Sequence, residues 1–241
     1  MSITDDKKLI SVQLKGFQII DLETSKTINY KAMKCNLAKT ICQPKNDSNV
    51  FFTTSISDKS IMKWDMRQPN EKLSPVQTYK CDLMLIRQLQ LYDNYAIIGG
   101  KGSQITKHNG IQIIDFRKES AVCSLQSFEK NQDIMTMILN ENSLYLGLRN
   151  HSIRRSVISF SEKRQLNLET LSSLNPPHYD TLTNLSLMYQ GKLVSGSKDK
   201  IIKLWNVSSN QEDASLIAQI NNPHQTNHIS CLLGNKYFDG F

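Results

Sequence analysis

Three groups of residues in this chain have side chains that could do chemistry. The first is His224, His228 and Cys231, whose nitrogen and sulfur atoms are donors that zinc accepts. Their H-x-x-x-H-x-x-C spacing would bring the side chains together on a helix better than on a strand, and a fourth ligand is not evident. We therefore interpret them as loop and strand residues and expect no metal.

The second group is the glycine-rich stretch at residues 99–103, which reads GGKGS. It lacks the G-x-x-x-x-G-K-[ST] spacing of a phosphate loop, and no predicted helix follows it to bind a phosphate. No Gly-x-Ser-x-Gly elbow occurs, and no Cys–His pair has a supporting context. The acidic pairs Asp5-Asp6 and Glu212-Asp213 are typical of a solvated surface. We therefore predict no catalytic residues, cofactor or small-molecule substrate.

The third group recurs along the chain inside a strand–turn–strand unit. Residues 195–207, SGSKDKIIKLWNV, predict two short strands joined by a turn, in which Asp199 can bond its own backbone. Residues 53–67, TTSISDKSIMKWDMR, have the same order, and six positions separate Asp58 from Trp64 as they separate Asp199 from Trp205. The recurrence indicates a repeat.

Three weaker copies extend the repeat: residues 17–23, 111–117 and 144–158. Aligned on one position, the copies fall at Asp21, Asp65, Asp115, Ser156 and Asn206, at intervals of 44, 50, 41 and 50 residues. A propeller repeat of this kind takes ~40–45 residues, and loop insertions such as residues 101–110 fit the excess. The apolar runs are short, and no convincing long helix is found. The pattern predicts an all-β chain of four-stranded antiparallel sheets set radially as propeller blades.

We expect residues 1–241 to form a single domain, with strands that include residues 60–65, 111–115 and 182–188. The blade units span roughly residues 1–31, 37–80, 83–127, 134–171 and 178–220, with a partial blade at 224–241. The first unit reads as a blade that lacks its innermost strand. Two arrangements stay open, a closed five-bladed ring and an incomplete ring of a larger propeller. We favour the incomplete ring because the sequence stops within a strand pattern, which would leave an unpaired edge.

The composition limits the setting and the partners. No apolar run reaches the ~18 residues of a membrane span, and the N-terminus lacks the apolar core of a secretory signal. We therefore expect a cytoplasmic protein with five free thiols, at Cys35, Cys42, Cys81, Cys123 and Cys231. The net charge of +7 fits an acidic partner, although a merely solvated surface is the favoured interpretation. Nucleic acid is not expected, because no block of basic residues interleaves with aromatics.

The two tryptophan-containing copies resemble WD repeats. The block at residues 176–187, PPHYDTLTNLSL, together with residues 191–207 and 222–233, is similar to the C-terminal propeller of kinesins that carry a WD-repeat tail. Residues 146–154 are similar to an earlier blade of that tail. The resemblance implies a propeller that associates with cargo or microtubules and does not hydrolyse ATP. Motor and coiled-coil sequences are absent here, so the connection to a motor is an expectation from the tail alone.

In WD-repeat families a buried network links a histidine, a serine or threonine, the turn aspartate and the tryptophan. His178, Ser195, Asp199 and Trp205 match all four positions, and Thr54, Asp58 and Trp64 match three. The resemblance implies that these residues are structural. We predict a non-enzymatic scaffold that binds proteins, or microtubules, through its loops. The alternative is a substrate-recognition or scaffold subunit of a ubiquitin ligase or another regulatory complex.

Overall fold

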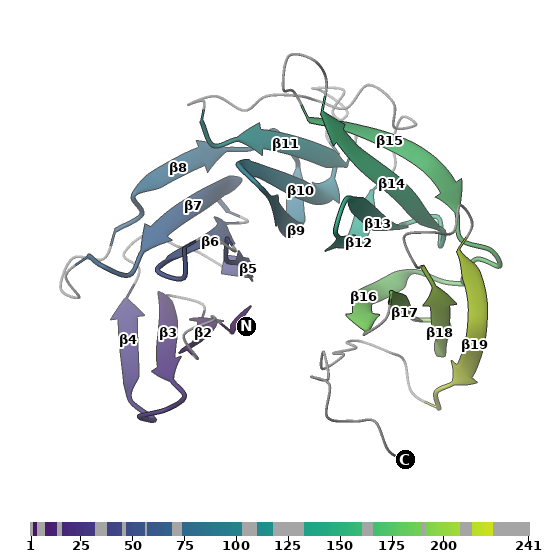
Figure 1. The fold of residues 1–241 in the computed structure, drawn as a ribbon, viewed down its shortest axis with the longest axis horizontal. Helices are drawn as coiled ribbons and strands as arrows, with labels where there is room; N and C mark the ends of the chain where they lie inside the picture. Colours follow the sequence, from purple (N-terminus) through teal and green to yellow (C-terminus); the bar gives the residue numbers. More distant parts are fainter. Residues whose placement is uncertain are drawn as a thin grey trace. The chain divides into compact units, whose positions relative to one another are not determined.

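The computed structural model describes residues 2–3, 8–13, 16–31, 38–44, 47–55, 57–68, 74–102, 110–117, 133–160, 166–188, 191–207 and 214–223. Every regular element in these ranges is a β-strand, and the strands form small antiparallel sheets (Figure 1). The predicted all-β class is therefore confirmed. The chain divides into two compact units, Met1–Ser124 and Leu125–Phe241.

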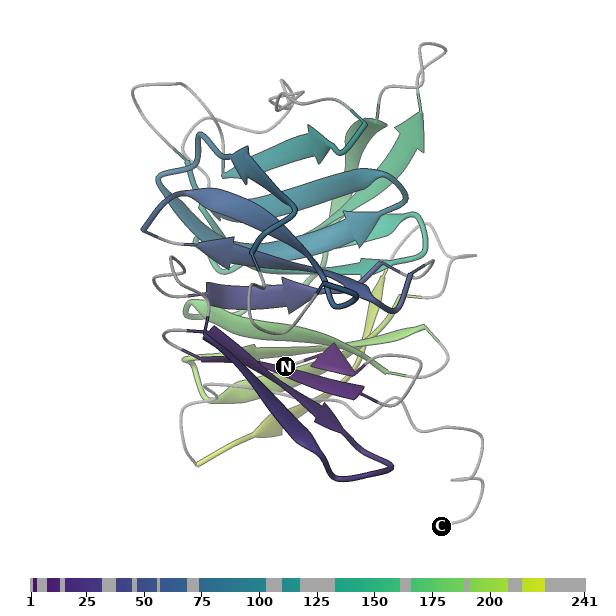
Figure 2. The same ribbon diagram turned by 90° about the vertical axis from the view of Figure 1, so that its left-hand side faces the viewer.

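The first unit contains three sheets, each with its described strands in sequence order. The first sheet consists of β1 (Ser2–Ile3), β2 (Lys8–Gln13), β3 (Gly16–Asp21) and β4 (Thr27–Lys31), and it is drawn in purple in Figure 2. The second consists of β5 (Ala38–Cys42), β6 (Val50–Ser55), β7 (Ser60–Asp65) and β8 (Gln77–Lys80). The third consists of β9 (Leu85–Tyr92), β10 (Tyr95–Lys101) and β11 (Ile111–Asp115).

The second unit contains two four-stranded sheets of the same topology. One consists of β12 (Ile134–Asn140), β13 (Ser143–Leu148), β14 (Ile153–Phe160) and β15 (Leu166–Ser173). The other consists of β16 (Leu182–Met188), β17 (Lys192–Ser197), β18 (Ile201–Asn206) and β19 (Ser215–Asn221). The predicted strands at residues 60–65, 111–115 and 182–188 begin and end as β7, β11 and β16 do. The predicted partial blade at residues 224–241 and the end of the third predicted blade unit, residues 118–127, lie outside the described residues.

The expectation that the first sheet lacks its innermost strand is wrong. Strand β1 pairs antiparallel with β2, through Ser2 with Ile10 and Ile3 with Leu9. A strand of two residues has no alternation of apolar and polar side chains, so its sequence carries no strand signal.

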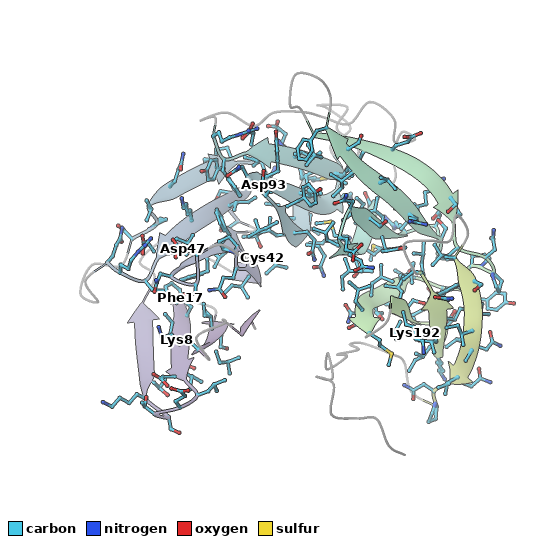
Figure 3. The ribbon with its side chains drawn as sticks, viewed as in Figure 1. Lys8, Phe17, Cys42, Asp47, Asp93 and Lys192 are labelled. Atoms are coloured by element: carbon cyan, nitrogen blue, oxygen red, sulfur yellow. The ribbon has the colours of Figure 1, made fainter. Side chains whose placement is uncertain are left out.

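The second sheet of the first unit packs on both of its faces, because successive side chains of a strand point to opposite sides. On one face Phe51, Met62 and Trp64 meet apolar residues of the first sheet. Phe17, labelled on β3 in Figure 3, lies edge-on to Phe51 and Trp64, with ring centroids 4.9 and 5.1 Å away. Edge-to-face contacts at these distances are the favoured geometry of aromatic pairs.

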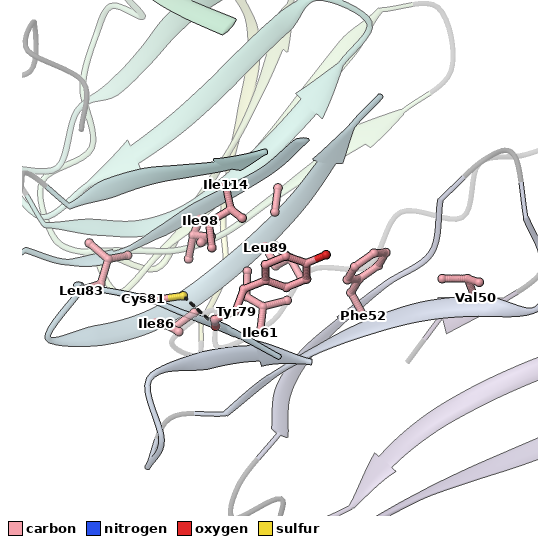
Figure 4. Close-up of a cluster of buried hydrophobic side chains, with 11 residues drawn as sticks. Val50, Phe52, Ile61, Tyr79, Cys81, Leu83, Ile86, Leu89, Ile98 and Ile114 are labelled. Atoms are coloured by element: carbon pink, nitrogen blue, oxygen red, sulfur yellow. Dashed lines mark hydrogen bonds between the residues drawn. The ribbon is translucent and has the colours of Figure 1, made fainter. Parts of the chain in front are cut away.

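The opposite face of the same sheet packs against the third sheet (Figure 4). Phe52, Ile61 and Tyr79 contribute from one side, and Leu89 and Ile98 are among the residues from the other. In the second unit, one face of each sheet meets the other in a core that includes Tyr145, Leu193 and Trp205. Face-to-face packing of neighbouring sheets thus buries the apolar alternation of the strands, which is the main favourable contribution to folding.

The aspartates of the repeat close the turn that follows the third strand of their sheets. Oδ1 of Asp21, Asp65 and Asp115 accepts a hydrogen bond from the backbone N–H two residues later, at 2.9, 3.0 and 3.0 Å. A carboxylate that bonds its own backbone in this way stabilises a turn, which explains why the repeat keeps an acid there.

The strand register corrects the alignment of one repeat. Asp65 and Asn206 pair with the first residue of the preceding strand, and Trp64 and Trp205 with its second residue. In the sheet β12–β15, Val157 pairs with Ser143 and Ser156 with Leu144. Ser156 therefore occupies the position of the tryptophans, not that of the acid as we expected. Without an acid or a tryptophan in this copy, nothing in the sequence marks the register.

Candidate functional site

The four residues that match the complete network come together at one end of the sheet β16–β19. Ser195 lies on β17 and Trp205 on β18, and Asp199 lies in the turn between these strands. His178 belongs to residues 175–181, which lead from β15 to β16 and are called the connecting segment below. The turn and the connecting segment are joined at their backbones by the bond from Lys198 N–H to the carbonyl of Thr181, at 3.0 Å.

A continuous chain of hydrogen bonds links the four side chains. The Nδ1 atom of His178 lies 2.9 Å from Asp199 Oδ2, and its Nε2 atom lies 2.8 Å from Ser195 Oγ. The indole N–H of Trp205 donates to the same Ser195 Oγ at 2.8 Å. A neutral imidazole with its proton on Nδ1 satisfies every member, because Ser195 then donates to Nε2 and accepts from Trp205.

The electrostatics of the site favour this neutral histidine. Burial lowers the pKa of His178, and it outweighs the opposing effect of Asp199. Burial also acts to raise the pKa of Asp199, but the N–H groups of Tyr179 and Ile201 and the contact with His178 lower it below its usual value. Those two N–H groups donate at 2.9 and 2.8 Å. The turn carboxylate thus stays ionised while the imidazole does not.

The arrangement Asp199–His178–Ser195 has the connectivity of a hydrolytic triad, but it does not present a nucleophile. Ser195 is 0% exposed, so a substrate has no access to its Oγ. That oxygen also accepts the indole hydrogen bond, whereas an attacking serine needs a lone pair directed at the substrate. The chemistry that remains is structural: a satisfied polar network that holds the turn, the connecting segment and the strands in one arrangement.

A fifth residue, Lys203, holds the connecting segment, and our sequence analysis missed it. Its side chain is buried, with 1% of the residue exposed, and Nζ donates to the carbonyls of Pro176 and Pro177 at 2.9 and 2.8 Å. Burial lowers the pKa of Lys203. The ammonium lies 5.7 Å from the ring centroid of Trp205. Because Lys203 is two positions before Trp205 on a strand, the alternation alone places it on the buried face.

The sheet β5–β8 places its candidate residues differently from our prediction. The indole N–H of Trp64 donates to Thr53 Oγ1 at 2.8 Å, not to Thr54. Thr54 is also buried, but its hydroxyl pairs with that of Thr40 at 2.9 Å. The alignment was displaced because five positions separate Thr53 from Asp58, against four between Ser195 and Asp199.

The carboxylate of Asp58 does not take the role of Asp199. Its Oδ2 accepts from Ser55 Oγ at 2.9 Å, and the residue is exposed. The contact between Asp58 and Ser55 therefore closes the β6–β7 turn locally. It does not connect that turn to the tryptophan.

The remaining candidates divide between described and undescribed parts of the chain. Gly100 lies at a register shift between β9 and β10, where a Cβ atom would meet the Leu85 carbonyl oxygen at 1.9 Å. This glycine therefore serves the close approach of two strands. His224, His228 and Cys231, Ser103 and the two acidic pairs lie outside the described residues.

Among the described residues, no three His, Cys, Asp or Glu side chains lie together as a metal site would require. The same residues include no helix long and apolar enough to cross a membrane.

Cys42 and Cys81 are free thiols. Burial raises the pKa of each to about 12. Both therefore stay protonated and unreactive at neutral pH. The three other cysteines lie outside the described residues.

The chain was also compared with known proteins. No protein-family model matches it, and no curated protein matches it.

Proposed function

We propose that this chain is a WD-repeat β-propeller that acts as a non-enzymatic scaffold for protein binding. The observation that carries the proposal is the hydrogen-bonded chain from Asp199 through His178 and Ser195 to Trp205, set in a four-stranded antiparallel sheet. These are the residue types that a WD repeat uses for stiffening a blade. Their burial leaves the loops at the sheet ends as the surface for function.

The packing of the sheets supports the propeller part of the proposal. In the first unit, the sheet β5–β8 is covered on one face by the sheet β1–β4 and on the other by the sheet β9–β11. Blades set radially around an axis bury both faces in this way, whereas a two-sheet sandwich buries only one face of each sheet. A small-angle scattering measurement tests it: one compact body of this length has a radius of gyration of about 18 Å. A clearly larger value would reject a single ring.

We further propose that the scaffold associates with cargo or microtubules. The support is the similarity of residues 176–187 to the propeller tail of kinesins, together with the net charge of +7. Co-sedimentation with polymerised tubulin at low and at raised salt tests the microtubule part. We expect the protein in the pellet at low salt and in the supernatant at raised salt, because salt screens contacts between exposed charges. An absence of binding at low salt would reject the proposed association with microtubules.

A further inference from the structure

Tyr179 is the most exposed large apolar residue of the described chain. It is 80% exposed, although both neighbours in the sequence have interactions that fix them, His178 in the buried network and Asp180 through its carbonyl. An exposed tyrosine on a flexible loop would need no explanation. Tyr179 instead lies on a segment that the protein holds in place.

Five hydrogen bonds fix the backbone around this ring. Lys203 donates to two carbonyls of the connecting segment, and Asp199 accepts the N–H of Tyr179 itself. The Ser197 hydroxyl donates to the Asp180 carbonyl at 2.9 Å, and the His178 N–H donates to the carbonyl of His151 at 3.3 Å. A rigid backbone that presents an aromatic side chain loses little conformational entropy on binding, which is what an anchor at a protein interface requires.

The charged side chains at this end of the sheet differ in how far they are exposed to solvent. Lys198 and Lys200, on either side of Asp199, are both exposed. The Asp199 carboxylate is turned inward, with 5% of its side chain exposed, and it accepts the hydrogen bonds described above. Asp180 is only partly exposed, and the backbone N–H of Thr181 lowers its pKa. The fully exposed charges beside Tyr179 are therefore those of the two lysines, while the lowered pKa keeps the partly exposed Asp180 carboxylate ionised.

We infer that Tyr179, Lys198 and Lys200 form a docking surface for an acidic segment of another protein. An apolar side chain of that segment packs against the Tyr179 ring and the exposed Pro177, and its carboxylates pair with the two lysines. The inference rests on the proposed scaffold function and names the chemistry of its partner. Charge complementarity selects an acidic segment, and the aromatic anchor selects one that also carries apolar side chains.

Fluorescence anisotropy tests this inference on the full chain, with a labelled twelve-residue peptide of the repeat Glu-Glu-Leu. We expect the parent protein to bind this peptide. Tyr179→Ala should weaken the affinity at least about tenfold, and Tyr179→Phe should keep the affinity within about twofold of the parent value. The double variant Lys198→Glu with Lys200→Glu should also weaken binding at least about tenfold and flatten its salt dependence. Because the three side chains are exposed, the unfolding midpoints should match that of the parent protein.

Matched substitutions elsewhere provide the controls. Met84→Ala changes another exposed apolar residue, and Lys26→Glu reverses another exposed charge. Both should bind the peptide as the parent does. Equal binding by Tyr179→Ala and the parent would overturn the inference, as would a parent that does not bind the peptide. If the chain bound a twelve-nucleotide oligo(dT) and did not bind the peptide, the inference of a protein partner would be overturned. Co-sedimentation that survives Tyr179→Ala, with peptide binding lost, supports this site and separates it from the microtubule contact.

Discussion

The sheets β16–β19 and β5–β8 bury a tryptophan at the same register position, yet they support it differently. Trp205 belongs to a network that extends through Ser195 and His178 to the turn aspartate, while the indole N–H of Trp64 donates to the local acceptor Thr53. The sequence contains no histidine before His108, so the earlier sheet cannot form the longer chain. One tryptophan position therefore accepts either a polar network that reaches the loops or a single local bond.

The same two sheets differ in how their second faces are covered. Ile61 and Tyr79 form a cross-strand pair on β7 and β8, and Tyr79 is 3% exposed because the third sheet packs on it. Ile202 and Ile220 form the equivalent pair on β18 and β19, and Ile220 is 63% exposed. The sheet β5–β8 thus gains stability from two apolar faces. The sheet β16–β19 depends more on its polar network, and this contrast sets the predictions below.

Removing the turn aspartate should have the largest and most unequal effect. Asp199→Ala leaves buried His178 and the Tyr179 N–H without their acceptor, and we expect it to lower the free energy of unfolding by about 1–3 kcal/mol. Asp58→Ala, the matched change, removes an exposed contact and should cost less than about 0.5 kcal/mol. Urea titrations of both variants measure the difference. Equal losses of unfolding free energy in the two variants would show that the Asp199 network contributes no more stability than a local turn contact.

The second prediction separates Thr53 from its neighbour Thr54. Thr53→Val keeps the shape but leaves the Trp64 indole N–H buried without its acceptor, at a cost of about 1–2 kcal/mol. Thr54→Val removes a bond to the partly exposed Thr40, whose groups can turn to water, and should cost less. Urea titration followed by tryptophan fluorescence measures both variants. A larger loss from Thr54→Val would restore the alignment that the sequence predicted.

The third prediction concerns pH. Because the folded pKa of His178 is lowered, the unfolded chain binds more protons between that pKa and about 6.5, so stability falls as the pH is lowered through this window. This contribution is at most about 1.4 kcal/mol per pH unit. It is fully present above pH 6.5 and does not change further below the folded pKa. Urea titrations from pH 7.5 to 5 should show this slope in the parent and a shallower one in His178→Gln. If stability changed with pH equally in the parent and in His178→Gln, the pH dependence would come from groups other than His178.

The fourth and smallest prediction uses the natural difference between Lys203 and its register equivalent, Met62. Lys203→Met copies the residue of the sheet β5–β8 and exchanges a buried charge for an apolar side chain, so the net change in stability should be small. The local effect should be clear, because the carbonyls of Pro176 and Pro177 lose their donor. Amide exchange of the connecting segment should become faster, while the reverse change, Met62→Lys, should destabilise the first unit. Unchanged exchange in Lys203→Met would mean that Lys203 does not hold the segment.

Much of the fold could be predicted from local pattern, and the errors have physical causes. Strands such as β7, β11 and β16 were found because apolar alternation and turn residues mark both of their ends. The complete network could be placed because its four residue types occur at their expected intervals. Thr54 was chosen in place of Thr53 because turn length is set by backbone geometry that residue spacing does not report. How far the sheets continue into a ring stays a prediction.

The direct test of the account is amide hydrogen exchange of the connecting segment in the parent and in Asp199→Ala, with the sheet β5–β8 as internal reference. If the buried network holds Tyr179 in its presenting position, the N–H of Tyr179 is protected in the parent and loses that protection in the variant, while β6 and β7 do not change. Equal protection of Tyr179 in the two proteins would contradict the account, because the segment would then be held without the network.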